Sequence, residues 1–137
     1  DVQAAAADSI AALKLSDAFE DLQQLYHQTS EWLVKFSIVA ALGELGDNRG
    51  FEILADALSS GNELMQTVAI GSLGELGDDR AVVLLIARAA NTKWQIRYRV
   101  AQALCHLDGA AARATLEQLA QDELEQIAQE ARNCLQD

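Results

Sequence analysis

Leu42-Gly43-Glu44-Leu45-Gly46-Asp47-Asn48-Arg49 recurs 31 residues later as Leu73-Gly74-Glu75-Leu76-Gly77-Asp78-Asp79-Arg80. A third, degraded copy, Leu104-Cys105-His106-Leu107-Asp108-Gly109, follows at the same spacing. An internal period of this length is typical of proteins built from stacked, repeated units of supersecondary structure. The repeat therefore indicates the fold more strongly than any other feature of the chain.

Each repeat carries the signals of two helices joined by a tight turn. Gly46 stands where a helix end favours a left-handed residue, and Asp47 stands where the next helix favours an N-cap. Ser30, Asn62 and Thr92 are candidate N-caps of three longer helices. The expected helices cover residues 1–14, 17–27, 30–45, 47–58, 62–76, 78–89, 93–107, 109–121 and 123–136.

One apolar stripe recurs along the longer helices at positions i, i+4, i+8 and i+11. Its members are Val34, Ile38, Leu42 and Leu45, then Met65, Ala69, Leu73 and Leu76, then Ile96, Val100, Leu104 and Leu107. Residues at this spacing share one helix face, and a single helix pair cannot bury such a face alone. We therefore predict an all-α chain, a right-handed α-solenoid of about four to five 31-residue repeats, in one domain over residues 1–137.

Composition limits the classes of partner. A net charge of −11 disfavours nucleic-acid binding, because phosphates would be repelled. No apolar run reaches the about 20 residues that a membrane span needs. The chain begins without Met inside an Ala-rich helical pattern. We therefore expect the C-terminal part of a longer array, and the apolar side of a terminal helix leaves a homodimer through the end repeats open.

Two cysteines, Cys105 and Cys134, lie in helical context without metal-ligand spacing or a disulfide-rich setting. Cys105 replaces Gly43 and Gly74 of the other copies, so we predict a small, buried packing residue there. Cys134 is predicted to be structural as well, and its equivalents are Ala41, Ser72 and Ala103. A reducing, cytoplasmic compartment is the simplest interpretation of this usage.

A cluster of aromatic and basic residues is the best candidate binding site. The basic residues between positions 80 and 107 are Arg80, Arg88, Lys93, Arg97 and Arg99. Because Trp, Tyr and Arg often dominate interface energies, the candidate partner-binding residues are Trp32, Lys35, Phe36, Trp94, Arg97, Tyr98 and Arg99. The alternative is that the aromatic residues pack on a neighbouring repeat. Lys35 and Arg97 would then bond to backbone carbonyls or to acids of the adjacent repeat.

The usual components of an active site are missing from the sequence. Cys105 and His106 are adjacent in a predicted helix, so their side chains point about 100° apart and do not form a nucleophile–base pair. The sequence has no Gly-rich phosphate loop, metal-ligand cluster or Ser/His/Asp pattern. We nominate no catalytic residue, metal or cofactor.

The two Leu-Gly-Glu-Leu-Gly-Asp segments, with the pairs Val34-Lys35 and Ile96-Arg97, resemble the HEAT-like repeat associated with phycobilin lyases. Residues 32–47 and 94–100 are most similar to cyanobacterial members that promote phycobilisome degradation under nutrient stress. The pattern departs at the turns, where Asn48 and Asp79 replace Pro, and at Ala128, where the family has Arg.

The resemblance implies a cytoplasmic module that binds phycobiliprotein subunits and assists phycobilisome degradation or chromophore handling. Bilin itself is left open as a ligand. Two alternative functions also stay open: a bilin lyase or chromophore-detaching enzyme, and a general protein–protein scaffold unrelated to pigments. Another protein with an acidic patch stays open as the partner. Fold alone does not decide among them.

Overall fold

Helix follows helix along residues 18–136, which are the part of the chain that the computed structural model describes. The elements are α2 (Ala18–Gln28), α3 (Trp32–Leu45), the 3₁₀ turn η1 (Asn48–Gly50), α4 (Phe51–Leu58), α5 (Glu63–Leu76), α6 (Ala81–Ile86), α7 (Trp94–Leu104), α8 (Ala110–Leu119) and α9 (Glu125–Leu135). The expected helix over residues 1–14 lies outside this part.

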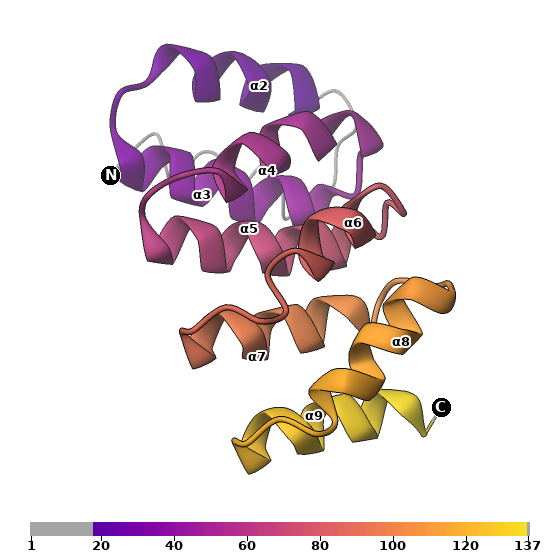
Figure 1. Ribbon diagram of the computed structural model, residues 1–137. Helices are drawn as coiled ribbons and strands as arrows, with labels where there is room; N and C mark the ends of the chain where they lie inside the picture. Colours follow the sequence, from indigo (N-terminus) through magenta and orange to yellow (C-terminus); the bar gives the residue numbers. More distant parts are fainter. Residues whose placement is uncertain (1–17, 137) are drawn as a thin grey trace.

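The helices form two layers (Figure 1). The helices α3, α5, α7 and α9 lie side by side in one layer and are called the long helices below. The helices α2, α4, α6 and α8 lie in the other layer and are called the short helices. No strand occurs within residues 18–136. The predicted all-α solenoid is therefore confirmed. None of the described helices has both the length and the apolar character needed to cross a membrane.

The apolar stripe of the long helices is the core of the stack. Eleven of its twelve members are buried, and Leu45 is half-buried. Each long helix packs against the next long helix and against the short helix that precedes it in the chain. The stripe on each long helix is therefore covered by both neighbours. Burial of this apolar area is the main favourable term in folding.

The Gly-Asp turns end two of the long helices as predicted. Gly46 and Gly77 both have φ near +75°, and their N–H groups donate to the carbonyls of Leu42 and Leu73. The αL conformation favours glycine because it has no Cβ. The Asp47 carboxylate then accepts the backbone N–H of Arg49 at 2.9 Å.

The third turn differs, and here the predicted helix 93–107 is too long. Asp108 stands where the other turns have glycine, so α7 has no αL cap after Leu107 and ends at Leu104. The positive φ moves one residue on, to Gly109 at +111°. The predicted helix 78–89 is also too long, because the chain beyond Ile86 continues in tighter turns. There the N–H groups of Arg88, Ala89 and Asn91 donate to carbonyls three residues back.

The predicted N-cap is right at Asn62 and wrong at Ser30 and Thr92. Asn62 accepts the N–H of Met65 at 3.1 Å, but Glu31 and Lys93 are the residues that precede α3 and α7. A different periodic signal marks these turns. The side chain two residues before the cap position accepts the cap residue's N–H in each repeat, and the four acceptors are Thr29, Ser60, Asn91 and Asp122. A side chain that accepts the N–H two residues ahead stabilises a local turn without any contact to another helix.

The prediction of a buried Cys105 is wrong. Cys105 is exposed just beyond the end of α7, and it forms a disulfide with the half-buried Cys134 of α9, with 5.5 Å between their Cα atoms. The early end of α7 places Cys105 outside the regular helix, where a side chain reaches the surface. Cys134, predicted to be a packing residue in the same way, instead has a covalent structural role, since the bond joins the last two long helices.

Candidate functional site

The long-helix layer carries a groove on its exposed side. Three adjoining hollows run across α3, α5, α7 and α9, and Arg99 lines all three. We call this surface the inner groove and define it by Phe36, Leu64, Gly71, Trp94, Tyr98 and Arg99. The groove is positioned by the stacking itself, because each of its residues lies on a long helix beside the buried stripe.

Apolar side chains give the groove its exposed surface. Trp94 is 41% exposed and Leu64 is 60% exposed, while Phe36 and Tyr98 are half-buried against the core. Exposed apolar residues that gather in a hollow, rather than standing singly, mark binding sites on soluble proteins. Leu64 was not among the candidate residues of the sequence. The available signal was its position, one residue after the equivalents of Trp32 and Trp94.

Arg99 is the cation of the groove. Its side chain is exposed, and one guanidinium nitrogen donates to Oε1 of Gln102 at 3.2 Å. Within residues 18–136, no carboxylate is bonded to Arg99. Glu63, Glu75 and Glu130 line the same three hollows as Arg99, and none of them is ion-paired with it. Arg99 therefore keeps most of its donors available for a ligand or a partner.

Arg97, unlike Arg99, is already bonded within the fold and is not a cation available to a ligand. Its Nε donates to Asp122 Oδ2 at 2.8 Å and its Nη1 to the Asn91 carbonyl at 2.9 Å. The side chains of Arg97 and Asp122 are only 12% and 8% exposed. These are the contacts expected under the second interpretation of Arg97, a bond to an acid of the adjacent repeat. The residue joins α7 to the turn before α9.

The pKa of Asp122 reports the same contact. Burial by itself would raise the pKa of this carboxyl. The hydrogen bonds from Arg97 and from the Leu124 N–H, together with the charge of Arg97, outweigh burial and lower the pKa below its ordinary value. Asp122 is therefore held as a carboxylate that is already used within the fold.

Trp32 and Lys35 line a separate hollow. The Lys35 ammonium lies 4.9 Å from the ring centroid of Tyr26, and the Trp32 ring packs edge to face on Phe36 with centroids 6.0 Å apart. Both Trp32 and Lys35 border a pocket beside Asp56 that does not include the groove residues of α7. The seven candidate residues thus divide between the groove, this side hollow and the Arg97–Asp122 pair.

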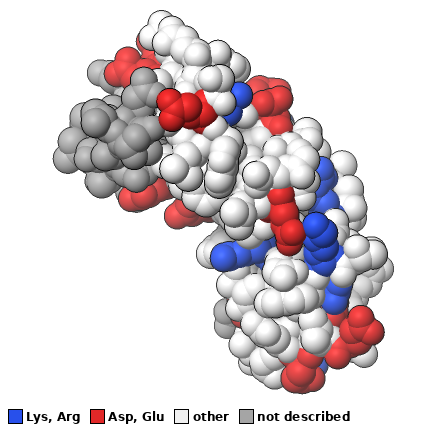
Figure 2. Space-filling view, turned by 90° about the vertical axis from the view of Figure 1, so that its left-hand side faces the viewer, with Lys and Arg blue, Asp and Glu red and all other residues white. Residues whose placement is uncertain are grey.

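Most other members of the basic group have partners within the molecule. Figure 2 shows most Lys and Arg side chains of this face gathered in the middle and lower part of the elongated molecule, with an acidic side chain among them and further acidic residues toward both ends. Lys93 pairs with Glu63 at 3.0 Å, and Arg88 donates to the carbonyls of Leu58 and Leu84. The basic group is therefore mainly structural, and Arg99 is its member on the groove.

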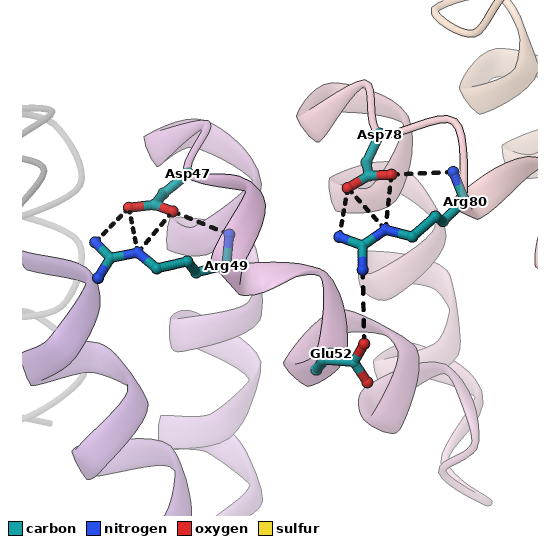
Figure 3. A network of polar contacts seen from close by, with 5 residues as sticks. All are labelled: Asp47, Arg49, Glu52, Asp78 and Arg80. Carbon is teal, nitrogen blue, oxygen red and sulfur yellow. Dashed lines mark hydrogen bonds and ion pairs between the residues drawn. The ribbon is translucent and has the colours of Figure 1, made fainter.

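Arg80 is the last residue of the repeated Gly-Asp-x-Arg motif, and it makes a set of contacts that we call the clamp. Its guanidinium bonds the Asp78 carboxylate at 2.7 Å and lies 3.7 Å from the Glu52 carboxylate (Figure 3). The guanidinium also stacks over the Phe51 ring, 4.2 Å from the ring centroid. Arg49 makes the equivalent contacts one repeat earlier, with Asp47, Glu20 and the Phe19 ring. Hydrogen bonds from Arg80 lower the pKa of Asp78. The Asp-x-Arg spacing therefore ties each turn to the preceding short helix.

The fold and its repeated contacts agree with a comparison to known families. A family model of HEAT repeats matches residues 1–69 and 51–136. The chain therefore belongs to the HEAT-repeat family. No curated protein matches the chain. The described residues include no group of three or more His, Cys, Asp or Glu that could hold a metal ion. HEAT repeats commonly mediate protein–protein interaction through the extended surfaces that such stacks create.

Proposed function

We propose that this chain is a protein-binding module whose inner groove receives a partner segment with apolar side chains and a carboxylate. The observation that carries the proposal is that Arg99 lines one hollow together with the exposed apolar residues Leu64 and Trp94, and that no carboxylate of residues 18–136 is bonded to it. An arginine in such surroundings gains strong, charge-assisted hydrogen bonds when an acidic group arrives. The aromatic residues supply the apolar contact that anchors an interface.

The partners we propose are phycobiliprotein subunits, and the role is assistance in phycobilisome degradation or chromophore handling in the cytoplasm. The support is the resemblance of Leu-Gly-Glu-Leu-Gly-Asp and its preceding helix to phycobilin lyase-type HEAT-like repeats. The propionates of a bilin have the same chemistry as a partner carboxylate, so Arg99 suits either. An acidic-patch protein unrelated to pigments would use the groove in the same way.

The partner is tested by titrating the chain into phycocyanin and allophycocyanin, with size-exclusion chromatography and absorbance recorded together. A co-eluting complex with an unchanged spectrum would support docking without chromophore chemistry. A loss or shift of the visible band would support the alternative, an enzyme or carrier that acts on bilin. No complex with either pigment protein would refute the phycobiliprotein assignment.

The groove is tested by charge reversal at matched positions. Arg99→Glu is expected to weaken the complex by about 30-fold or more, the factor that corresponds to a hot spot of about 2 kcal/mol. Arg113→Glu makes the same charge change on an exposed residue of α8 outside the groove and is expected to bind normally. Equal affinities of the two variants would show that the groove is not the docking site.

A further inference from the structure

The glycine contacts between long helices form a series. Gly43 of α3 faces Ser72 of α5, and Gly74 of α5 faces Ala103 of α7, each pair 29 residues apart. A Cβ placed on either glycine would lie 2.7 Å from the Cα atom opposite. No real Cβ atom approaches a backbone atom so closely, so these two junctions require glycine. The third member of the series, at the same separation of 29, is the Cys105–Cys134 disulfide.

A cysteine cannot take the place of glycine in so close an approach. The 5.5 Å between the Cα atoms of Cys105 and Cys134 exceeds the separation at the glycine junctions, where even a Cβ would almost touch the opposite backbone. The α7/α9 junction is therefore wider, and two sulfur atoms bridge it. Both cysteines of the chain stand on this one pair of positions, so the close contact is replaced by a covalent one.

The last helix pair also lacks the outer clamp of the earlier repeats. Ala111 stands where the turns before it have Arg49 and Arg80, so no guanidinium can tie the start of α8 back to α6 in the same way. Besides its buried apolar contacts, α9 is attached to α7 at two points. The Arg97–Asp122 pair holds its beginning, and the disulfide holds its last turn.

The disulfide is open to reagents from the surface. Cys105 is exposed, and the pair borders a surface hollow that also includes Arg113 and Leu135. Cys105 further lines the end of the inner groove beside Arg99 and Glu130. Accessible disulfides exchange with thiolates, whereas those enclosed by the core do not. The bond is therefore placed where its state can be changed while the core stays intact.

We propose that Cys105–Cys134 is a reversible thiol–disulfide exchange site for dithiol reductants, and that its state controls how firmly α9 is attached beside the groove. One thiolate of the reductant attacks the sulfur of Cys105, forming a mixed disulfide and releasing Cys134 as a thiolate that takes up a proton. The second thiol of the reductant displaces Cys105, which is released as the second thiol. The reductant ends as a disulfide, and the protein gains two electrons and two protons. A small-molecule disulfide such as oxidised glutathione reverses these steps.

The inference does not depend on the identity of the partner and is tested on the whole chain without one. The oxidised protein is treated with dithiothreitol under native conditions, its thiols are counted by alkylation and mass spectrometry, and amide hydrogen exchange is followed by residue. Reduction is expected with the helical circular dichroism retained. Exchange in residues 125–135 should then rise by about tenfold or more, while α3 and α5 are unchanged. Oxidised glutathione should restore the protection.

The control variant is Cys105→Gly with Cys134→Ala, which restores the residue pair of the Gly74–Ala103 junction. Its exchange in α9 should not respond to dithiothreitol. The proposal would be overturned by reduction only after unfolding, by reduction with unchanged exchange in α9, or by an equal response to dithiothreitol in the control variant. A protein whose two thiols stay reduced in excess oxidised glutathione would overturn it as well.

Discussion

Gly74 offers a direct test of the helix stacking. It lies on α5, and a methyl group there would meet the Cα of Ala103 at 2.7 Å and its Cβ at 2.8 Å. These atoms belong to the backbone region of α7, which cannot rotate aside as the end of a flexible side chain can. Gly74→Ala therefore forces α5 and α7 apart at the centre of the stack, where the buried stripes of both helices meet.

The expected magnitude comes from two opposing effects. Alanine in a helix interior is favoured over glycine by about 0.5–1 kcal/mol, and overpacking of a tight core costs about 1–3 kcal/mol. Gly71 supplies the matched control because it lies on the same helix, is exposed, and has no atom within 4 Å of an added Cβ. The propensity gain is common to both variants, so the free energies of unfolding of Gly71→Ala and Gly74→Ala should differ by about 1–3 kcal/mol.

The measurement is urea unfolding followed by far-UV circular dichroism, with all three proteins under the same buffer conditions. Gly71→Ala should be at least as stable as the parent chain, and Gly74→Ala should be less stable. Comparable slopes with urea are required, since stacked repeats can lose two-state behaviour. If Gly74→Ala matched Gly71→Ala in stability, α5 and α7 would not make the close approach described above, and the account of the disulfide as its substitute would lose its basis.

Three further outcomes follow from contacts elsewhere in the stack. Arg97→Ala should reduce the free energy of unfolding by about 1–3 kcal/mol, while Arg99→Ala should change it by less than about 0.5 kcal/mol, both measured by urea unfolding. Asp122 has a folded-state pKa below its unfolded value. Its contribution to stability is therefore present above the ordinary carboxyl range and is lost as the pH falls through the folded pKa. Asp122→Asn should flatten this loss of stability on the acid side of the ordinary carboxyl range. Ile70→Ala removes a fully buried side chain and should lower stability by about 2–5 kcal/mol in thermal or urea unfolding.

The architecture could be predicted because its signals are local and repeated. The glycine at Gly46 and Gly77 ends a helix wherever it occurs, and the apolar stripe marks the buried face without knowledge of the neighbouring helix. The errors lie where that local signal changes. At Asp108 the glycine is displaced by one residue, so α7 ends early and the predicted end at residue 107 is wrong.

The candidate site was harder to predict because periodicity does not show which side chains meet across repeats. Arg97 and Arg99 lie on one helix and look alike in sequence. Yet Arg97 bonds to Asp122, 25 residues away, whereas no acid in the described part of the chain is bonded to Arg99. Trp32 and Trp94 occupy equivalent positions but line different hollows. Such differences depend on the register between neighbouring helices, and this register is set by the packing of the folded stack rather than by any local sequence signal.

Cys105 and Cys134 each depart from the repeat, and the register between α7 and α9 brings the two departures into contact. Taken singly, Cys105 is a substitute for Gly74, and Cys134 is a substitute for Ala103, so each looks like a small packing residue. Once the stack shows that position 74 faces position 103, the same offset of 29 brings the two substitutions to one junction. The glycine of the earlier junctions is replaced by Cys105, and the alanine opposite it is replaced by Cys134. The two sulfur atoms bridge the wider gap that the larger side chains require. In a repeat protein, departures from the repeat should therefore be compared in pairs at the offset of the contact between helices. A pair that changes together at that offset is better evidence of a specific contact than either residue alone.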